Sequence, residues 1–280
     1  MNITVTLLYL LSFPLAYGIA DMLWMMLGHK VPFFKSIVYR GVVSVILTFA
    51  FAIILEPTDG LNLFSLVRAA GTGFLAVMAF LLFYKSLQQK TSGINAFITK
   101  GLTSVVAVTI VMCIAQQIDF KILLALAALI IGLLFLYFNK DDHNKKVSLP
   151  AIAAGIVWGI VTVLYKKHVQ EIGSFWFAFI LELTLLITVL IIYIFIKKEH
   201  AYKFTTKQFL IILFIGLATA AGSVLNTYTY NYFTPSIISI AAKFAILPPF
   251  LFAIIILKQK LSLQKVIGLV VILLAIYLSL

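Results

Sequence analysis

Two lysines stand inside long apolar stretches of the chain, where a charge is costly. Lys100 lies in the run TSGINAFITKGLTSVVAVTIVMCIAQ and Lys243 in TPSIISIAAKFAILPPFLFAIIILKQ. The runs align without a gap, so that Thr91 meets Thr234 and Lys100 meets Lys243. A charge at the bilayer centre costs about 2.5–3.5 kcal/mol on insertion scales, and its default interpretation is a functional site. An ammonium group in a dry cavity favours phosphate or carboxylate, so the pair predicts one shared anion site. The alternatives are that each side chain extends to the nearer interface or pairs with a carboxylate.

Asp21 and Glu182 are the carboxylates that lie well inside apolar runs. A buried carboxylate can take up a proton, which suits proton coupling in a transporter. The alternative is that each is a counter-ion for Arg40, Lys100 or Lys243. Arg40 itself, also inside an apolar run, could be a gate or a structural partner.

One apolar run carries hydroxyls and an amide at helical spacing: Thr219, Ser223, Asn226, Thr227 and Tyr230. Such a face can bind the hydroxyl groups of a metabolite or bond neighbouring helices, which is worth about 0.6 kcal/mol on average. The same two interpretations, substrate lining or ordinary packing, apply to Tyr17, Tyr84, Asn95, Trp158 and Trp176.

Composition places the chain in a membrane. Of 280 residues, 63% are hydrophobic and 11% charged, against about 25% charged in soluble domains. The apolar runs are far longer than the ~10-residue strands of an outer-membrane barrel, so the fold is expected to be all-α. The net charge of +12 lies mostly in loops and is a topology signal, so no nucleic-acid partner is expected.

Nothing in the sequence predicts an enzyme, a cofactor or a metal site. The histidines are far apart, and Asp141, Asp142 and His143 have no second acidic cluster to complete a catalytic centre. The single cysteine, Cys113, cannot form a disulfide within the chain.

Ten membrane spans fit the length, because each needs about 20 apolar residues. The expected spans are 4–27, 33–55, 62–84, 92–115, 120–138, 149–166, 174–196, 208–230, 235–257 and 262–280. The longest polar break, 139–148, divides the chain into five-span repeats at 1–138 and 149–280. Because five is odd, the second repeat would insert upside down relative to the first, and such inverted repeats place the substrate site near the midplane, at the interface between the repeats. Pro248 and Pro249 predict a break in the ninth span just past Lys243.

The ten spans, the five-plus-five plan, the short loops and the GIVWG…YKK segment at 155–167 resemble the drug/metabolite transporter superfamily, of the EamA-like type. The resemblance implies a central cavity surrounded by spans 1–4 and 6–9, with spans 5 and 10 outside, where they could support a homodimer. Sugar-phosphate translocators of that superfamily bind phosphate through lysines on spans 4 and 9, which match Lys100 and Lys243. Their span 9 carries a basic pair, whereas Phe244 follows Lys243 here. Many relatives have both termini in the cytosol, whereas the basic loops of this chain place the termini outside, and the orientation is left open.

The sequence therefore predicts a multi-pass integral protein of a bacterial inner or plasma membrane, with the lipid bilayer and a small-molecule substrate as partners. It would move a small organic, anionic metabolite by alternating access as a secondary-active transporter. An exporter of neutral or zwitterionic metabolites such as amino acids, or a lipid-phosphate flippase, is the alternative.

Overall fold

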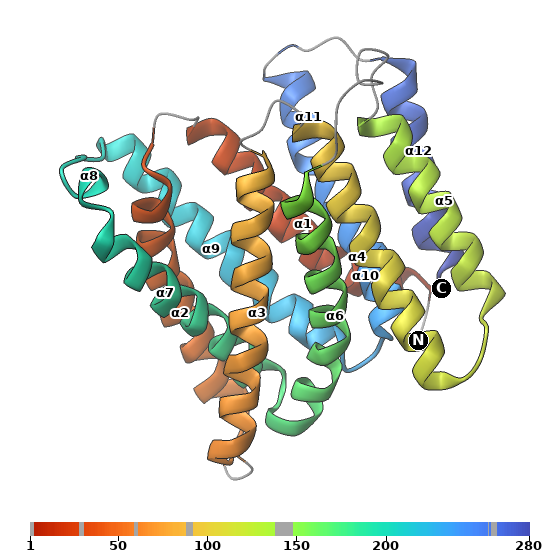
Figure 1. The fold of residues 1–280 in the computed structure, drawn as a ribbon, viewed down its shortest axis with the longest axis horizontal. Helices are drawn as coiled ribbons and strands as arrows, with labels where there is room; N and C mark the ends of the chain where they lie inside the picture. Colours follow the sequence, from red (N-terminus) through yellow and green to blue (C-terminus); the bar gives the residue numbers. More distant parts are fainter. Residues whose placement is uncertain are drawn as a thin grey trace. The chain divides into compact units, whose positions relative to one another are not determined.

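We describe the fold from a computed structural model of the chain, which covers residues 3–27, 31–58, 61–87, 92–137, 148–256, 258 and 262–280. Every regular element within these residues is a helix. In chain order (Figure 1) they are α1 (Ile3–Leu27), α2 (Phe33–Leu55), α3 (Leu63–Leu87), α4 (Ser92–Ala115), α5 (Phe120–Tyr137), α6 (Leu149–Ile172), α7 (Ser174–Phe195), α8 (Lys197–His200), α9 (Thr206–Thr229), α10 (Pro235–Ala241), the 3₁₀ helix η2 (Ala242–Ile246), α11 (Leu247–Ile255) and α12 (Leu263–Leu278).

The helices confirm the predicted all-α membrane fold. Nine candidate spans in the described residues are long and apolar enough to cross a bilayer, and Leu263–Leu278 is a shorter apolar helix. The predicted span 149–166 is too short, because α6 continues to Ile172. The lysines at 166 and 167 therefore lie within the helix and do not end it. The predicted linker 139–148 lies outside the described residues except for Ser148, so the division into two repeats stays a prediction.

The ninth predicted span, 235–257, is divided. The chain runs from α10 through η2 into α11, and Lys243 lies within the 3₁₀ segment. Proline lacks an N–H, and its ring clashes with the carbonyl group four residues earlier. Pro248 and Pro249 therefore disturb the helix at Phe244 and Ala245. The helix is therefore broken near the prolines, as predicted. The break was predicted just past Lys243, whereas the 3₁₀ segment includes this lysine.

The described chain forms two compact units, and the first consists of Met1–Phe74, His168–Tyr232 and Ala245–Leu257. Within it α1 packs against α9 and α11, while α2 packs against α7 and α9. Glycine permits the closest of these approaches. A side chain at Gly216 would collide with the carbonyl oxygen of Arg40, and one at Gly222 would collide with the ring of Tyr17.

The ends of helices in this unit are tied down by side chains. The Glu56 carboxylate, just after α2, accepts hydrogen bonds from the backbone N–H groups of Ser174, Phe175 and Trp176 at the start of α7. The first N–H groups of a helix lack partners within it and carry partial positive charge, so a carboxylate there satisfies both needs. Gly173 precedes α7 with φ of 84° and ψ of 160°, a conformation that is essentially confined to glycine.

The second unit consists of Leu75–Lys167, Phe233–Phe244 and Lys258–Leu280. The helices α5 and α12 lie side by side and run in opposite directions (Figure 1), and α4 contacts both α5 and α10. Gly132 of α5 and Gly268 of α12 meet at the crossing of their helices, where neither has room for a side chain.

The two glycines of the GIVWG segment explain how α6 packs in the second unit. Gly155 and Gly159 are one turn apart and lie against α4 at Thr99, Leu102, Thr103 and Val106. Small residues at this spacing let two membrane helices approach closely. The Thr99 hydroxyl also donates to the carbonyl oxygen of Ala151, at 2.9 Å, which joins the same pair of helices.

Candidate functional site

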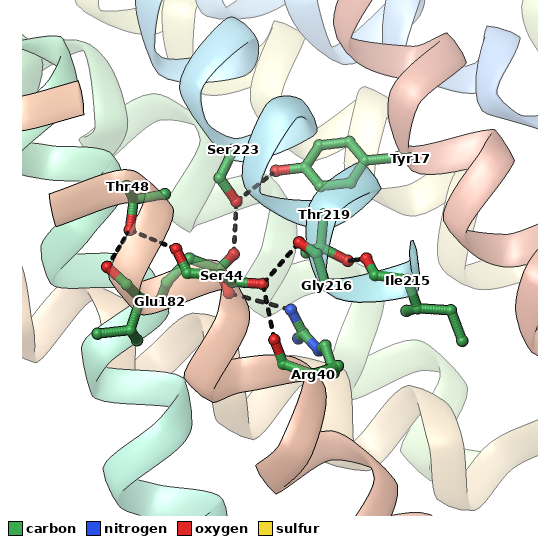
Figure 2. A network of polar contacts seen from close by, with 10 residues as sticks. Tyr17, Arg40, Ser44, Thr48, Glu182, Ile215, Gly216, Thr219 and Ser223 are labelled. Atoms are coloured by element: carbon green, nitrogen blue, oxygen red, sulfur yellow. Dashed lines mark hydrogen bonds and ion pairs between the residues drawn. The ribbon is translucent and has the colours of Figure 1, made fainter. Parts of the chain in front are cut away.

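A buried ion pair lies at the centre of a polar network in the first unit. Nη1 of Arg40, on α2, lies 3.0 Å from Oε2 of Glu182, on α7, and both side chains are 8% exposed. The hydroxyl of Ser223, on α9, donates to the other carboxylate oxygen of Glu182, and the hydroxyl of Tyr17, on α1, lies 3.2 Å from Oγ of Ser223. Four helices thus contribute to one network (Figure 2). Both oxygens of Glu182 are engaged, which makes this carboxylate the counter-ion of Arg40.

The backbone holds the helices of this network in close contact. Ser44 lies one turn after Arg40, and its hydroxyl donates to the carbonyl oxygen of Gly216 at 3.0 Å. That bond joins α2 to α9 beside the ion pair, as Figure 2 shows. Gly41 faces Leu186 of α7 closely, and a Cβ at this position would lie 3.2 Å from Cδ1 of Leu186. Close approach on both sides keeps water away from the pair, and two buried opposite charges then attract each other strongly.

The predicted polar face on α9 is used mostly by its own helix. The hydroxyls of Thr219 and Thr227 donate to carbonyl oxygens four residues earlier, at 2.7 Å and 2.9 Å. Ser223 does reach other helices, because its hydroxyl donates to Glu182 of α7 and lies 3.2 Å from the hydroxyl of Tyr17 of α1. Tyr230 is buried. Ser223 is therefore the residue of this face that joins α9 to the network around Glu182.

Two further predicted residues of the first unit are Asp21 and Trp176. Asp21 is exposed on α1. Trp176 is buried at the start of α7, where its ring packs against Phe49 and Phe179. Its indole N–H has no hydrogen-bond partner among the described residues.

The two predicted lysines belong to the second unit and lie near each other. The Ser104 hydroxyl of α4 donates to the carbonyl oxygen of Ser239 of α10, at 3.0 Å. Figure 1 shows that α4 and α10 run in opposite directions. Lys100 precedes Ser104 by one turn and Lys243 follows Ser239 by four residues, so both lie on the same side of this bond. Their charges are close enough to repel each other.

The lysines differ in their surroundings. Lys243 is 6% exposed, and the structure gives its side chain no hydrogen bond and no ion pair among the described residues. Lys100 is half-buried, with its ammonium nitrogen 5.8 Å from the centre of the Tyr137 ring. The second unit therefore gathers two positive charges, one of them buried without a carboxylate.

The remaining predicted residues of the second unit lie on α3, α4 and α6. Nδ2 of Asn95 donates to the carbonyl oxygen of Ser86 at 2.8 Å, and its Oδ1 accepts from the backbone N–H of Ser148 at 3.1 Å. Its amide thus fastens the starts of α4 and α6 to the end of α3. Trp158 lies against Phe83, with ring centres 5.3 Å apart, and Tyr84 is half-buried.

A second, partly buried polar cluster of the first unit, which the sequence did not predict, is formed by Arg68, Thr72, His168 and Glu171. It lies between α3 and the last turns of α6. Ending the sixth span at 166 placed His168 outside the helix. The signal that could have revealed it is the spacing of His168 and Glu171, which are one helical turn apart. Among the described residues, no group of three or more His, Cys, Asp or Glu side chains is arranged to hold a metal ion.

Comparison with known proteins decides the class. Residues 145–280 match the family model described as the EamA-like transporter family. This part of the chain is similar to that family, which lies within the drug/metabolite transporter superfamily. A solved structure described as "Crystal structure of protein" is similar to the chain with a TM-score of 0.77 and 10% identity, over 98% of this chain and 96% of the other. At that identity the likeness shows the fold alone. No curated protein matches the chain.

The EamA-like match confirms the predicted resemblance and, with the membrane-length helices, the predicted localisation. The chain is an integral multi-pass membrane protein, and the family that its residues 145–280 match is one of small-molecule transporters and does not suggest an enzyme.

Proposed function

We propose that this EamA-like protein is a secondary-active transporter of a small organic anion, bound through phosphate or carboxylate by Lys100 and Lys243. The observation that carries the proposal is the burial of Lys243 without an ion-pair partner among the described residues. A charge that is removed from water without a counter-charge is strongly disfavoured. An anionic ligand would supply the missing counter-charge.

The nearby charge of Lys100 supports the same conclusion. Two ammonium groups that repel each other raise the free energy of the empty site, and an anion that contacts both lowers it. Phosphate and carboxylate have several acceptor oxygens and can bind two ammonium groups at once. The half-buried position of Lys100 leaves its charge partly hydrated until a ligand arrives.

The polar network of the first unit supports an anionic substrate in a different way. The Glu182 carboxylate already accepts from Arg40 and Ser223. It is therefore poorly placed to bind the ammonium group of a zwitterion. An exporter of neutral or zwitterionic metabolites would have to use another acceptor.

The test is binding of glucose 6-phosphate, inorganic phosphate, succinate and alanine to the full chain in detergent, measured as a shift in unfolding temperature. A ligand present at a hundred times its Kd stabilises the folded state by about 2.7 kcal/mol. We expect phosphate compounds or succinate to raise the unfolding temperature of the wild type. They should not raise that of Lys100→Gln or Lys243→Gln. Lys121→Gln, at an exposed lysine, is the matched control and should respond like the wild type.

The ligand-free variants provide a second criterion. Lys243→Gln removes a buried charge and should unfold at a higher temperature than the wild type, while Lys121→Gln should not. If only alanine stabilises the protein, or if the lysine variants still respond to the anions, the neutral or zwitterionic exporter replaces this proposal.

A further inference from the structure

A chain of four polar side chains crosses from α3 to the last turns of α6 in the first unit. The hydroxyl of Thr72 lies 2.8 Å from Nε2 of His168. On the other side of the imidazole, Nδ1 lies 3.4 Å from Oε2 of Glu171. The second carboxylate oxygen of Glu171 lies 3.1 Å from Nη2 of Arg68. His168 is 4% exposed, whereas the side chains of Glu171 and Arg68 are 22% and 36% exposed, so the imidazole is buried and the ion pair beside it is partly in contact with its surroundings.

The position of Arg68 leaves one oxygen of Glu171 facing the imidazole. The guanidinium of Arg68 lies over the ring of Phe64, 4.5 Å from its centre. Such a cation–aromatic contact holds the guanidinium in place. Arg68 therefore contacts Oε1 of Glu171, while Oε2 faces His168.

The arrangement can accept one proton without moving a helix. A neutral imidazole carries one N–H, and a protonated one carries two. When His168 takes a proton from water, both ring nitrogens become donors, toward the Thr72 oxygen and toward Glu171. Thr72 suits both states, because a hydroxyl can donate to a bare ring nitrogen or accept from an N–H. No other covalent bond forms or breaks.

The charged groups that face His168 have opposite effects on its protonation. Glu171, on the same helix, favours the imidazolium, and Arg68, from α3, opposes it. The helix α7 contributes the uncharged ring of Phe177, whose centre is 5.3 Å from that of the imidazole. Because Glu171 is the nearer of the two charges, protonation turns the polar contact between His168 and Glu171 into an ion pair.

The cluster lies on two helices that continue from one unit into the other. The helix α3 leaves the first unit after Phe74, and α6 enters it at His168. Thr72 is thus two residues from one such point, and His168 is at the other. A change in the path of α3 or α6 at these points therefore acts on this cluster.

We propose that His168, held between Thr72 and Glu171, is a proton-binding site, and that the proton bound there is coupled to the movement that carries substrate. The coupling to an anionic substrate rests on the proposed function, whereas the proton site does not.

The first experiment needs no substrate. Hydrogen–deuterium exchange of the full chain in lipid nanodiscs is measured at about pH 5.5 and about pH 7.5, on either side of the usual histidine titration. After correction for intrinsic rates, we expect exchange in 63–74 and 168–172 to be roughly tenfold slower at the lower pH, the effect of one unit of proton linkage. His168→Gln should abolish the difference. His200→Gln, at a histidine on the exposed α8 segment, is the control and should retain it.

Glu171→Gln is the second variant, in case His168→Gln does not fold. It keeps the side-chain shape and removes the counter-charge, so the pH difference should shrink. If His168→Gln, or in its place Glu171→Gln, retains the full difference, the proton site is refuted.

The second experiment separates coupling from substrate binding. Liposomes that contain the protein are tested for glucose 6-phosphate accumulation driven by a pH gradient and for its exchange at equal pH. His168→Gln should lose accumulation and retain exchange. Equal accumulation by wild type and His168→Gln would refute the coupling. If the wild type moves no phosphate or carboxylate compound, the proposed function fails, and the deuterium exchange still decides whether His168 binds a proton.

Discussion

The ion pair between Arg40 and Glu182 gives the sharpest prediction about the first unit. Glu182→Gln keeps the size of the side chain and retains an oxygen that can accept from Ser223. It places an amide, which donates from nitrogen, opposite Nη1 of Arg40, which also donates. The substitution therefore removes the counter-charge and leaves the guanidinium buried.

The expected cost is large because the pair is buried. Both side chains are 8% exposed and the two atoms are 3.0 Å apart. Removing one partner of a buried pair costs about 3–5 kcal/mol, whereas an exposed pair contributes about 0–1 kcal/mol. The double variant Arg40→Met with Glu182→Gln has no buried charge at this position. It should be more stable than Glu182→Gln alone.

The assay is a double-mutant cycle on the free energy of unfolding, measured by reversible unfolding in mixed micelles. Residues that interact directly show interaction energies of about 0.5–3 kcal/mol, and we expect the upper part of that range here. If Glu182→Gln lowers the free energy of unfolding by less than about 1 kcal/mol, the ion pair does not stabilise the fold as proposed. The same follows if the effects of Arg40→Met and Glu182→Gln on that free energy are additive. The same variants separate the two roles predicted for Glu182. A structural counter-ion predicts that the double variant regains transport, whereas a proton carrier predicts that it does not.

Three further predictions concern a helix cap and two glycines, and thermal unfolding of the purified chain measures all three. Glu56→Ala removes the carboxylate that caps α7 and should lower the free energy of unfolding by about 2 kcal/mol. Gly173→Ala should lower it by about 1–3 kcal/mol because of the backbone conformation of Gly173. Gly71→Ala is the control, because a new Cβ there meets nothing within 4 Å, and a loss of stability in Gly173→Ala no greater than in this control would contradict the prediction. Gly159→Ala should cost about 1–3 kcal/mol by overpacking, because its Cβ would lie 2.5 Å from Cβ of Val106; an unchanged unfolding temperature would show that α4 and α6 are not in close contact.

The elements that sequence analysis placed correctly are those fixed by composition and local chemistry. Apolar length determines the spans, and two prolines that cannot donate determine the break near Lys243. Both signals are contained within one segment, so they need no knowledge of which helices meet. The end of α6 was harder to place, because a double lysine commonly marks the membrane interface, whereas the helix here continues for another turn and more.

The partners of the buried charges could not be predicted from the sequence in this way. Glu182 had three possible counter-ions, and the choice of Arg40 depends on which helix faces α7. Ser223 and Tyr17 meet because Gly222 allows α1 to approach α9. In a membrane, glycine and hydroxyl side chains are common at packing contacts of all kinds, so their presence does not identify a pair.

The buried cations Arg40 and Lys243 differ in a way that separates structure from binding. Arg40 is paired with Glu182, so the fold itself supplies its counter-charge, and this residue is explained by stability. Lys243 is buried in a broken helix, and the nearby charge of Lys100 repels it. A fold optimised for stability alone would replace such a lysine with an uncharged residue. Retaining it makes the empty protein less stable and the anion-bound protein more so, which is the property that a carrier of anions requires.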